Sequence, residues 1–274
     1  LIRDIIIHAD ERSYTTVGKK TLVAEFDRNF AEDIGIAVCG EFDEDDTYSF
    51  DYYLPYLRSD LVSTAEDISI ERHAAKESYA GICDDPKVGV SLIFYLQNMI
   101  SYLKLQGEGK IPAKGTSLNL SALSCQGTIM MPIQKTEWQK KKIAKDAVQR
   151  NRLIQAARGG DEEAMESLTL EDMDTYTSIS RKIQKADIFS LVDTYFMPYG
   201  VECDQYSVLG EITDMKLVTN GLTGEKVHIL TLCCNDLNLK VAINSIDLLG
   251  EPAVGRRFKG SVWLQGQVNF PEES

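Results

Sequence analysis

The sequence lacks the short motifs that mark the common classes of enzyme. It holds only three histidines, His8, His73 and His228, and no G-x-S-x-G turn, so no nucleophile stands beside a recognisable base. A GxxxxGK(S/T) phosphate loop is also absent, and the glycine-rich segment 107–115 does not open a βαβ unit. The sequence therefore carries no catalytic signature, and we predict no cofactor.

Long apolar runs and paired cysteines are also missing. The longest apolar candidate, residues 88–103, is broken by Gln97 and Asn98 and falls short of the ~20 apolar residues that a membrane helix needs. The six cysteines are scattered without a CxxC pair, mostly in apolar runs, which favours buried thiols over a zinc site. We therefore expect a cytoplasmic protein with no membrane partner. Because the chain opens LIRDIII without Met, we expect a fragment.

What is present is the composition of an ordinary globular protein. The 274 residues are 43% hydrophobic and 26% charged, which suits one large domain or two modest ones. The net charge of −13 argues against a general nucleic-acid coat protein. Residues 135–158, however, hold eight basic and two acidic side chains, and within them Lys140, Lys141, Lys142 and Lys145 form a candidate basic helix. Binding phosphates is one interpretation, and a solvated helix that balances an acidic molecule is the commoner one.

Alternation of apolar residues predicts the N-terminal elements. Residues 1–7 have helical spacing, whereas residues 34–42 and 48–54 alternate with period two on either side of the acidic tetrapeptide DEDD, residues 43–46. This pattern predicts a β-hairpin. The four carboxylates could attract Mg²⁺ or Ca²⁺, but they lack EF-hand spacing, and a solvated hairpin tip is the favoured interpretation.

The middle of the chain changes from strand to helix. Residues 64–84 fit either a helix or strands, and residues 88–96 favour a strand with a bulge near Gln97 and Asn98. Residues 117–133 form another strand-like run. Residues 135–158 then predict a helix that ends at a Gly-Gly pair. Two further short helices are expected, one capped by Asp161 and one capped by Thr169.

From Tyr206 onward the sequence predicts strands again, in the runs YSVLGEI, KVHILTLCC, LKVAINSI and FKGSVWLQGQV, with TNGLTGE as a hairpin loop. The predicted fold class is α+β. We expect an N-terminal antiparallel β-rich α+β domain over residues 1–134, a helical segment over 135–194, and a small β-barrel-like, OB-like module over 195–274.

A tryptophan stands among basic and amide residues in the last of these strands. On an open face, Arg256, Arg257, Lys259 and Trp263 would resemble the stacking platform of an OB-fold, and they are our candidate binding residues. Trp263 can instead plug an interface between parts of the chain, which we favour. The run KVHILTLCC is apolar on both faces, so another part of the chain, expected to be the helical middle, should cover it.

Several longer runs carry a resemblance to a known family. They are DYYLPYLRS, ERHAAKESYAGICDD, KVGVSLIFYLQN, DTYFMPYGVECDQYSVLGEI and GEPAVGRRFKGSVWLQGQV. The chain resembles an uncharacterised family of Gram-positive anaerobic bacteria, domain-of-unknown-function family 3881, over nearly its whole length. The resemblance implies a bacterial cytoplasmic protein and brings no catalytic residue, cofactor or partner with it.

Three classes of function follow from these observations. The first hypothesis is a non-enzymatic binding or scaffold protein, whose partner is a protein or a nucleic acid. The second is a metal-dependent hydrolase or transferase that uses acidic residues, and the third is single-stranded nucleic-acid binding through the C-terminal β module. A purely structural role in a larger assembly would fit an inert protein. The sequence alone names no metal ligands.

Overall fold

The structure is a computed structural model that describes residues 1–18, 21–72, 78–85, 88–112, 114–133, 137–183 and 192–271, with part of the side chains in the two central helices left out. The helices are α1 (Ile2–Ile7), α2 (Met99–Gly107), α3 (Glu137–Arg158), α4 (Glu162–Ile183) and the 3₁₀ turn η2 (Ser245–Asp247). The first strands are β1 (Glu11–Val17), β2 (Thr21–Ala31), β3 (Ile34–Phe42), β4 (Tyr48–Leu57), β5 (Ile68–Arg72), β6 (Tyr79–Cys83) and β7 (Leu92–Leu96). The remaining strands are β8 (Ser117–Met130), β9 (Tyr195–Pro198), β10 (Gln205–Thr219), β11 (Lys226–Cys234), β12 (Leu237–Asn244), β13 (Leu248–Leu249) and β14 (Arg257–Asn269).

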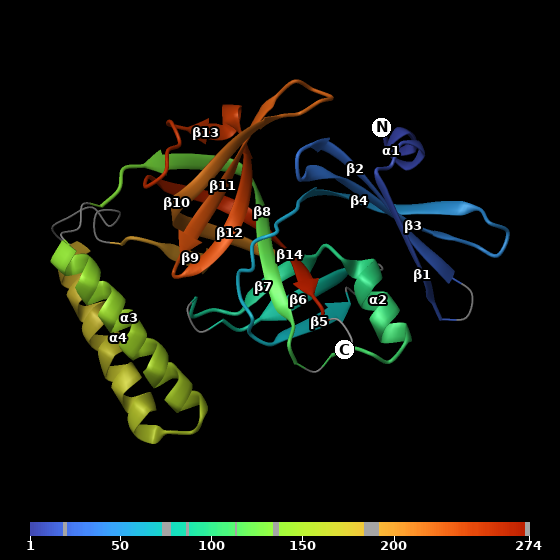
Figure 1. Cartoon of the computed structure of the whole chain (residues 1–274). Helices are drawn as coiled ribbons and strands as arrows, with labels where there is room; N and C mark the ends of the chain where they lie inside the picture. Colours follow the sequence, from blue (N-terminus) through green and yellow to red (C-terminus); the bar gives the residue numbers. More distant parts are fainter. Residues whose placement is uncertain are drawn as a thin grey trace.

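The first four strands form an antiparallel sheet in the order β1-β2-β3-β4 (Figure 1). Successive side chains of a strand point to opposite faces, and here both faces are covered. Ala24, Phe26 and Val38 pack with Ile5 of α1 on one face. The other face of β2 and β3 turns toward the rest of the molecule, where Val23 joins the main hydrophobic core. The predicted hairpin of residues 34–54 is confirmed as β3 and β4.

A closed five-stranded barrel forms the centre of the second sheet. Strands β10, β11 and β12 are a meander of antiparallel neighbours, β14 pairs with β10, and β8 closes the ring by pairing with both β14 and β12. The β8–β12 pair is parallel and the other four are antiparallel. Strands β7, β6 and β5 continue the sheet from the end of β14. The predicted α+β class, with an N-terminal antiparallel sheet, a helical middle and a C-terminal barrel, is confirmed.

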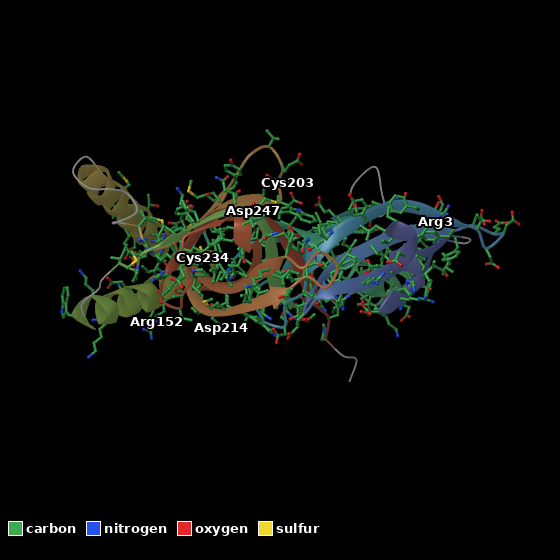
Figure 2. All side chains as sticks on the ribbon, turned by 90° about the horizontal axis from the view of Figure 1, so that it is seen from above. Arg3, Arg152, Cys203, Asp214, Cys234 and Asp247 are labelled. Atoms are coloured by element: carbon green, nitrogen blue, oxygen red, sulfur yellow. The ribbon has the colours of Figure 1, made fainter. Side chains whose placement is uncertain are left out.

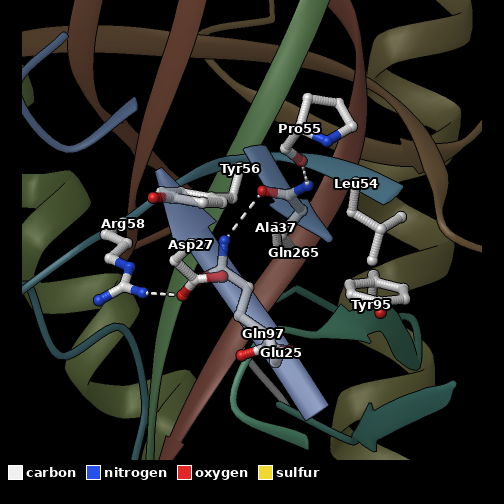
Figure 3. Close-up of a pocket in the computed structure, with 10 residues that line it drawn as sticks. All are labelled: Glu25, Asp27, Ala37, Leu54, Pro55, Tyr56, Arg58, Tyr95, Gln97 and Gln265. Atoms are coloured by element: carbon white, nitrogen blue, oxygen red, sulfur yellow. Dashed lines mark hydrogen bonds and ion pairs between the residues drawn. The ribbon is translucent and has the colours of Figure 1, made fainter. Parts of the chain in front are cut away.

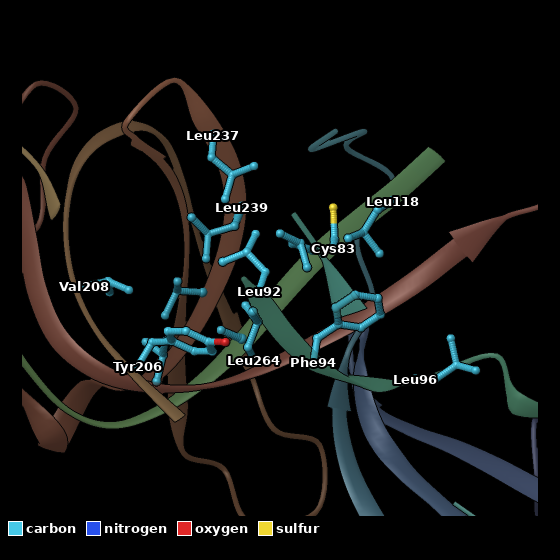
Figure 4. Packing of buried hydrophobic residues seen from close by; sticks show 14 of the residues in the cluster. Cys83, Leu92, Phe94, Leu96, Leu118, Tyr206, Val208, Leu237, Leu239 and Leu264 are labelled. Carbon is cyan, nitrogen blue, oxygen red and sulfur yellow. The ribbon is translucent and has the colours of Figure 1, made fainter. Parts of the chain in front are cut away.

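The main core fills the barrel and the space below it (Figure 4). Phe94 of β7 is fully buried, and it lies over two glycines. A Cβ atom at Gly81 would come within 2.0 Å of the Phe94 ring, and one at Gly266 within 2.5 Å. The ring therefore occupies the space that side chains would take on both neighbouring strands, so Gly81 and Gly266 are fixed by close packing.

Helices α3 and α4 form a hairpin that projects away from the barrel (Figure 1). Seen from above, this hairpin, with Arg152, and the N-terminal sheet lie at opposite ends of the molecule (Figure 2). Its base is held by Arg257, which is 7% exposed and donates to the carbonyl oxygens of Met131 and Val192 at 3.1 and 2.9 Å. One side chain thus bonds both chain segments that lead into and out of the hairpin.

The structure corrects one predicted helix cap, confirms another, and replaces a predicted strand bulge by a turn. Thr169 begins no helix, because α4 runs through it and its hydroxyl donates to the carbonyl of Met165 one turn earlier. The predicted cap at Asp161 is confirmed, since its carboxylate accepts from the backbone N–H of Ala164. The expected bulge at Gln97 is instead a turn that leads into α2.

The cover over KVHILTLCC also differs from the prediction. Val227 and Ile229 on the outer face of β11 pack with Leu57 and Ile34 of the N-terminal sheet, not with the helical middle. Lys240 of β12 forms an ion pair with Asp60 at 2.6 Å. The N-terminal sheet therefore covers the outside of β11 and β12, which explains why both faces of that run are apolar.

The cysteines were expected to be buried, and this holds for part of the set. Cys39, Cys83 and Cys234 are buried, whereas Cys125 and Cys203 are exposed, and all six are free thiols. Residues 64–84, left open by the sequence, contain the strands β5 and β6, with residues 73–77 outside the described part. Among the described residues, no helix combines the length and the apolar character that crossing a membrane requires.

Candidate functional site

Strand register brings ionisable side chains together between the N-terminal sheet and the barrel. Glu25 of β2 lies opposite Cys39 of β3, which in turn lies opposite Tyr52 of β4. Asp27 is two residues further along β2, so it shares the face of Glu25. All four side chains lie on the face that turns toward β7 and β14. A row of polar groups thus lies in the interface between two sheets.

A pocket opens within this interface, and we call it the seam pocket (Figure 3). It encloses about 340 Å³, including the part open to solvent. Its lining comes from β2, β3, β4, β7, β14 and the residues just after β4 and β7: Glu25, Asp27, Ala37, Leu54, Pro55, Tyr56, Arg58, Tyr95, Gln97 and Gln265.

Two glutamine side chains fix one wall of the seam pocket. Gln265, 1% exposed, accepts from the backbone N–H of Leu57 and donates to the carbonyl of Pro55. Gln97 donates to the carbonyl of Leu57 at 2.9 Å and to Gln265 Oε1 at 2.9 Å (Figure 3). The end of β4 is therefore bonded through side-chain amides to the barrel strand β14 and to the residue after β7, which makes the wall rigid.

Asp27 is the most exceptional polar group of the pocket. Its side chain is only 8% exposed, and its Oδ2 accepts a charge-assisted hydrogen bond from Arg58 (Figure 3). Its other oxygen, Oδ1, is buried and accepts no hydrogen bond from the residues that the structure describes. Burial raises the pKa of Asp27 to about 6, although Arg58 acts in the opposite direction. A buried acceptor without a donor costs ~1–3 kcal/mol.

Glu25 lies two residues before Asp27 on the same face of β2 and is half-buried. Burial and, to a smaller extent, the charge of Asp27 raise the pKa of Glu25 from an ordinary value of 4.5 to about 8. The carboxyl group is therefore largely neutral at pH 7. The Cys39 thiol approaches its Oε2 at 3.7 Å, and burial raises the pKa of that thiol well above its ordinary value. Cys39 therefore stays a thiol and is no nucleophile under neutral conditions.

The pocket also has an aromatic and a cationic side. The guanidinium of Arg58 lies over the ring of Tyr56 at 5.1 Å and donates to Glu11 as well as to Asp27. Burial raises the pKa of Tyr56 and of Tyr95, so both phenols stay protonated. The rings supply apolar surface next to the carboxylates, an arrangement that suits a small ligand with a polar head and an apolar stem.

The four candidate binding residues, Arg256 just before β14 and three residues within it, do not share one open face. Trp263 is partly buried, donates through Nε1 to Asp204 at 2.6 Å and packs against the Tyr95 ring at 5.7 Å between centroids. Arg257 is committed to the hairpin base, and the Arg256 guanidinium donates to the carbonyl of Glu251 at 2.6 Å. Lys259 is partly buried. Whether these residues meet a partner stays a prediction.

The candidate basic residues lie on α3, at the far end of the molecule from the seam pocket. Lys141, Lys142 and Lys145 are exposed, and the side chain of Lys140 lies outside the described residues. The Lys142 ammonium lies over the ring of Trp138 at 5.6 Å. These lysines face solvent on the projecting hairpin, away from the strands that carry Trp263.

The acidic hairpin tip is a turn stabilised by its own backbone. The Asp43 carboxylate accepts from the backbone N–H groups of Asp45 and Thr47, which is a local turn bond. Within the described part of the chain, no three or more His, Cys, Asp or Glu side chains gather in a way that would hold a metal ion. His228 is partly buried in β11, and burial lowers its pKa.

Sequence reasoning missed the residues of the seam pocket. The signal was present in TLVAEFDRNF, where Glu25 and Asp27 alternate with Ala24 and Phe26 inside an apolar strand. Such a pattern is typical of a strand with one wet face. Only the second sheet packed over that face buries Asp27 and half-buries Glu25. Gln97 and Gln265 carried no signal of a pocket.

These features define a class of protein: an antiparallel sheet packed on a five-stranded barrel, with a polar pocket in the interface. The chain matches the family described as "Domain of unknown function, E. rectale Gene description (DUF3881)" over residues 1–266, and it belongs to that family. The resemblance inferred from the sequence is thereby confirmed. Comparison with curated proteins and with solved structures finds no match.

Proposed function

We propose that this chain is a non-enzymatic binding protein that holds a small ligand in the seam pocket. The observation that carries the proposal is Asp27, whose Oδ1 is buried at the pocket without a hydrogen-bond donor. A ligand that supplies this donor would remove the cost of the unsatisfied acceptor. The rigid wall of Gln97 and Gln265 supports the proposal, because a preformed pocket loses little free energy in ordering around a ligand.

A ligand screen tests this function. Small polar compounds are added to the protein, and the melting temperature is measured for the wild type and for Asp27→Asn. We expect at least one compound to raise the melting temperature of the wild type in proportion to log concentration. The shift should be lost in Asp27→Asn and kept in Asp45→Asn, which removes the same charge from the exposed hairpin tip. A set of hits that Asp27→Asn leaves unchanged would contradict the proposal.

A second candidate function is single-stranded nucleic-acid binding through the barrel. The order of the barrel strands supports an OB-like assignment: β10, β11 and β12 form the meander, β14 returns to β10, and β8 lies parallel to β12. An OB barrel whose last strand had moved to the front of the chain would have this strand order, which supports the assignment. The contact role of Arg256, Arg257, Lys259 and Trp263 belongs to this proposal.

The N-terminal sheet argues against that second candidate. OB-folds bind nucleic acid on the face of their second and third strands, which correspond here to β11 and β12. In this chain the sheet covers that face. Glu32, between β2 and β3, forms an ion pair with Lys216 of β10, and Asp60, just after β4, forms one with Lys240 of β12. Carboxylates thus occupy lysines that phosphates would need.

Fluorescence anisotropy separates the two candidates. The protein is titrated with mixed-sequence single-stranded DNA and RNA at low and at physiological salt. We expect no binding at physiological salt, and binding at low salt that Trp263→Ala does not change, because exposed lysines of α3 bind any polyanion weakly. Saturable binding at physiological salt that Trp263→Ala weakens would favour the barrel as a nucleic-acid platform.

The remaining parts of the proposal concern setting and organisation. The family description, which names E. rectale, supports a bacterial origin, and six free cysteines support the cytoplasm. We keep the division into residues 1–134, 135–194 and 195–274 as a proposal, noting that the barrel takes β8 from the first of these. A metal-dependent hydrolase remains the enzymatic alternative. It requires that Mg²⁺, Mn²⁺, Zn²⁺ or Ca²⁺ raise the melting temperature and that EDTA reverse the rise.

A further inference from the structure

The hydrogen-bond donors of the pocket wall are already committed. The amide nitrogen of Gln97 donates to Leu57 O, to Gln265 Oε1 and, at 3.3 Å, to Ser121 Oγ. The amide nitrogen of Gln265 donates to Pro55 O. Asp27 Oδ1, and the carboxylate of Glu25 once it is ionised, are thus acceptors in a wall whose amide donors bond within the protein. A ligand must therefore bring donors of its own.

The charges of the pocket favour a positive donor. Arg58 is the cation of the lining, and its guanidinium already bonds to Glu11 at 2.9 Å and to Asp27. When Glu25 is ionised as well, two carboxylates and one guanidinium line the pocket, with Glu11 also drawing on that guanidinium. A ligand cation would balance the charge of Glu25, which burial otherwise makes unfavourable.

The rest of the lining suits a short apolar stem. Ala37 and Leu54 present aliphatic surface, and Tyr56 and Tyr95 present rings. Arg58 lies over the Tyr56 ring. Tyr95 is held at its hydroxyl by Tyr52 and at its ring by Trp263, so it forms a fixed side of the pocket. Methylene groups attached to a cation would remove this surface from water.

We propose that the seam pocket takes a primary alkylammonium group, with the –NH₃⁺ head donating to Asp27 Oδ1 and to Glu25 and the stem lying against Leu54 and Tyr95. This inference rests on the proposed binding function and specifies its ligand. The ammonium head is compact, carries three donors and has no acceptor, so it matches a site that offers acceptors. A planar guanidinium would meet the space that Arg58 already fills.

Binding of such a cation is coupled to a proton. The groups that face Glu25 are Asp27 on its own strand, Cys39 on β3, Tyr52 on β4, Glu11 on β1, Tyr95 on β7, and Arg58 after β4. Because the pKa of Glu25 is raised to about 8, the free pocket holds a proton at pH 7. An ammonium ligand favours the ionised carboxylate, so binding at pH 7 releases that proton and affinity rises with pH toward 8.

Isothermal titration calorimetry with n-butylammonium chloride is the test. Titrations at pH 7 in HEPES and in phosphate, which differ in ionisation enthalpy and contain no primary ammonium group, give the number of protons released. A series from pH 6 to pH 8 gives the pH dependence. n-Butanol and sodium butyrate are the neutral and anionic probes of matched length. We expect binding of the ammonium alone, release of close to one proton at pH 7, and about a fiftyfold gain in affinity from pH 6 to pH 8.

Variants assign the effect to the pocket. Asp27→Asn should weaken n-butylammonium binding at least tenfold, and Glu25→Gln should abolish proton release, while Asp45→Asn should change neither. Equal binding of n-butanol, or binding of butyrate, would overturn the ammonium assignment and leave the pocket as a binding site. A pocket that binds neither the three probes nor any compound of the wider screen would overturn the binding function itself. Circular dichroism checks that each variant is folded. If a variant does not fold, the number of protons released by the wild type still tests the proposal.

Discussion

At the scale of single residues, Glu25 and Arg257 show that the chemistry of a strand side chain depends on what packs over the strand. Glu25 is an acid in a strand whose two faces are both covered, so it is held neutral by its surroundings. Arg257 was a candidate binding residue on condition that its face was open, and in the structure its guanidinium donates to the carbonyls of Met131 and Val192. In both cases the second element packed over the strand decides the chemistry of the side chain.

Glu25 makes folding stability depend on pH. Its pKa is about 8 in the folded chain and near 4.5 when unfolded, so between these values the folded state binds more protons. The free energy of unfolding therefore falls as pH rises from about 5 to 8. We expect Glu25→Gln to remove this part of the loss, on the order of 2 kcal/mol. Urea denaturation at pH 5 and pH 8 measures it, with the exposed Glu71→Gln as control, and an unchanged pH dependence in Glu25→Gln would contradict the assignment.

Arg257 and Arg256 form a natural pair for comparison. Arg257→Ala leaves the carbonyls of Met131 and Val192 without their buried donor, and we expect it to cost about 2–3 kcal/mol. Arg256 is less buried and bonds a surface carbonyl, so Arg256→Ala should stay within about 0.5 kcal/mol. Chemical denaturation compares the two variants, and equal losses would show that Arg257 is no special clamp.

At the scale of elements, each sheet relies on close approach between an aromatic ring and a glycine on a neighbouring strand. Phe94 lies over Gly81 and Gly266, and Tyr56 lies over Gly35, where an added Cβ would come within 2.4 Å of the phenol oxygen. These pairs allow adjacent strands to pack without a gap. They also bring Tyr56 into the lining of the seam pocket.

Gly81→Ala tests this packing. The added methyl group would lie 2.0 Å from the Phe94 ring, which is buried and has little space to move, so we expect a loss of about 2–3 kcal/mol. Gly107→Ala is the matched control, because no atom lies within 4 Å of its added Cβ. Thermal denaturation of both variants gives the answer, and a Gly81→Ala variant as stable as the wild type would contradict the packing argument.

Much of the element pattern could be predicted from the sequence, because alternation and helix stops are local signals. The hairpin of β3 and β4, the long strand β8 and the end of α3 all follow from such signals. The position of Thr169 inside α4 could not be predicted in this way. A threonine hydroxyl can cap the start of a helix or, as here, donate to a carbonyl one turn earlier within it. The seam pocket depends on Gln97 and Gln265, residues far apart in the chain whose contact arises only from tertiary packing.

At the scale of the whole molecule, a compact body carries one projecting arm. Ion pairs and side-chain amides tie the N-terminal sheet to the barrel, including Lys240 with Asp60 and Asn119 with the carbonyl of Ser59. The arm of α3 and α4 leaves this body and returns at the clamp of Arg257. The body should therefore unfold as one cooperative unit, with the arm contributing little.

Removing the arm tests this division. Because one guanidinium bonds both Met131 and Val192, those two residues are close enough for a short Gly-Ser linker to replace residues 132–191. We expect the shortened chain to keep its melting temperature within a few degrees and to lose helical signal in circular dichroism. Loss of cooperative unfolding would show that the arm is part of the core.

The closing strand of the barrel is synthesised long before its partners. β8 ends at Met130, whereas β12 and β14, which pair with it, end at Asn244 and Asn269. At ~5–20 residues per second, synthesis of these partners takes roughly 6–28 s, during which most of the β8 backbone has no strand partner. The lysine-rich start of α3 is synthesised soon after β8. Positive charge next to an unpaired strand discourages association between nascent chains. Although α3 and α4 project away from the finished barrel (Figure 1), the charge of α3 would therefore act on the nascent chain, before the barrel closes.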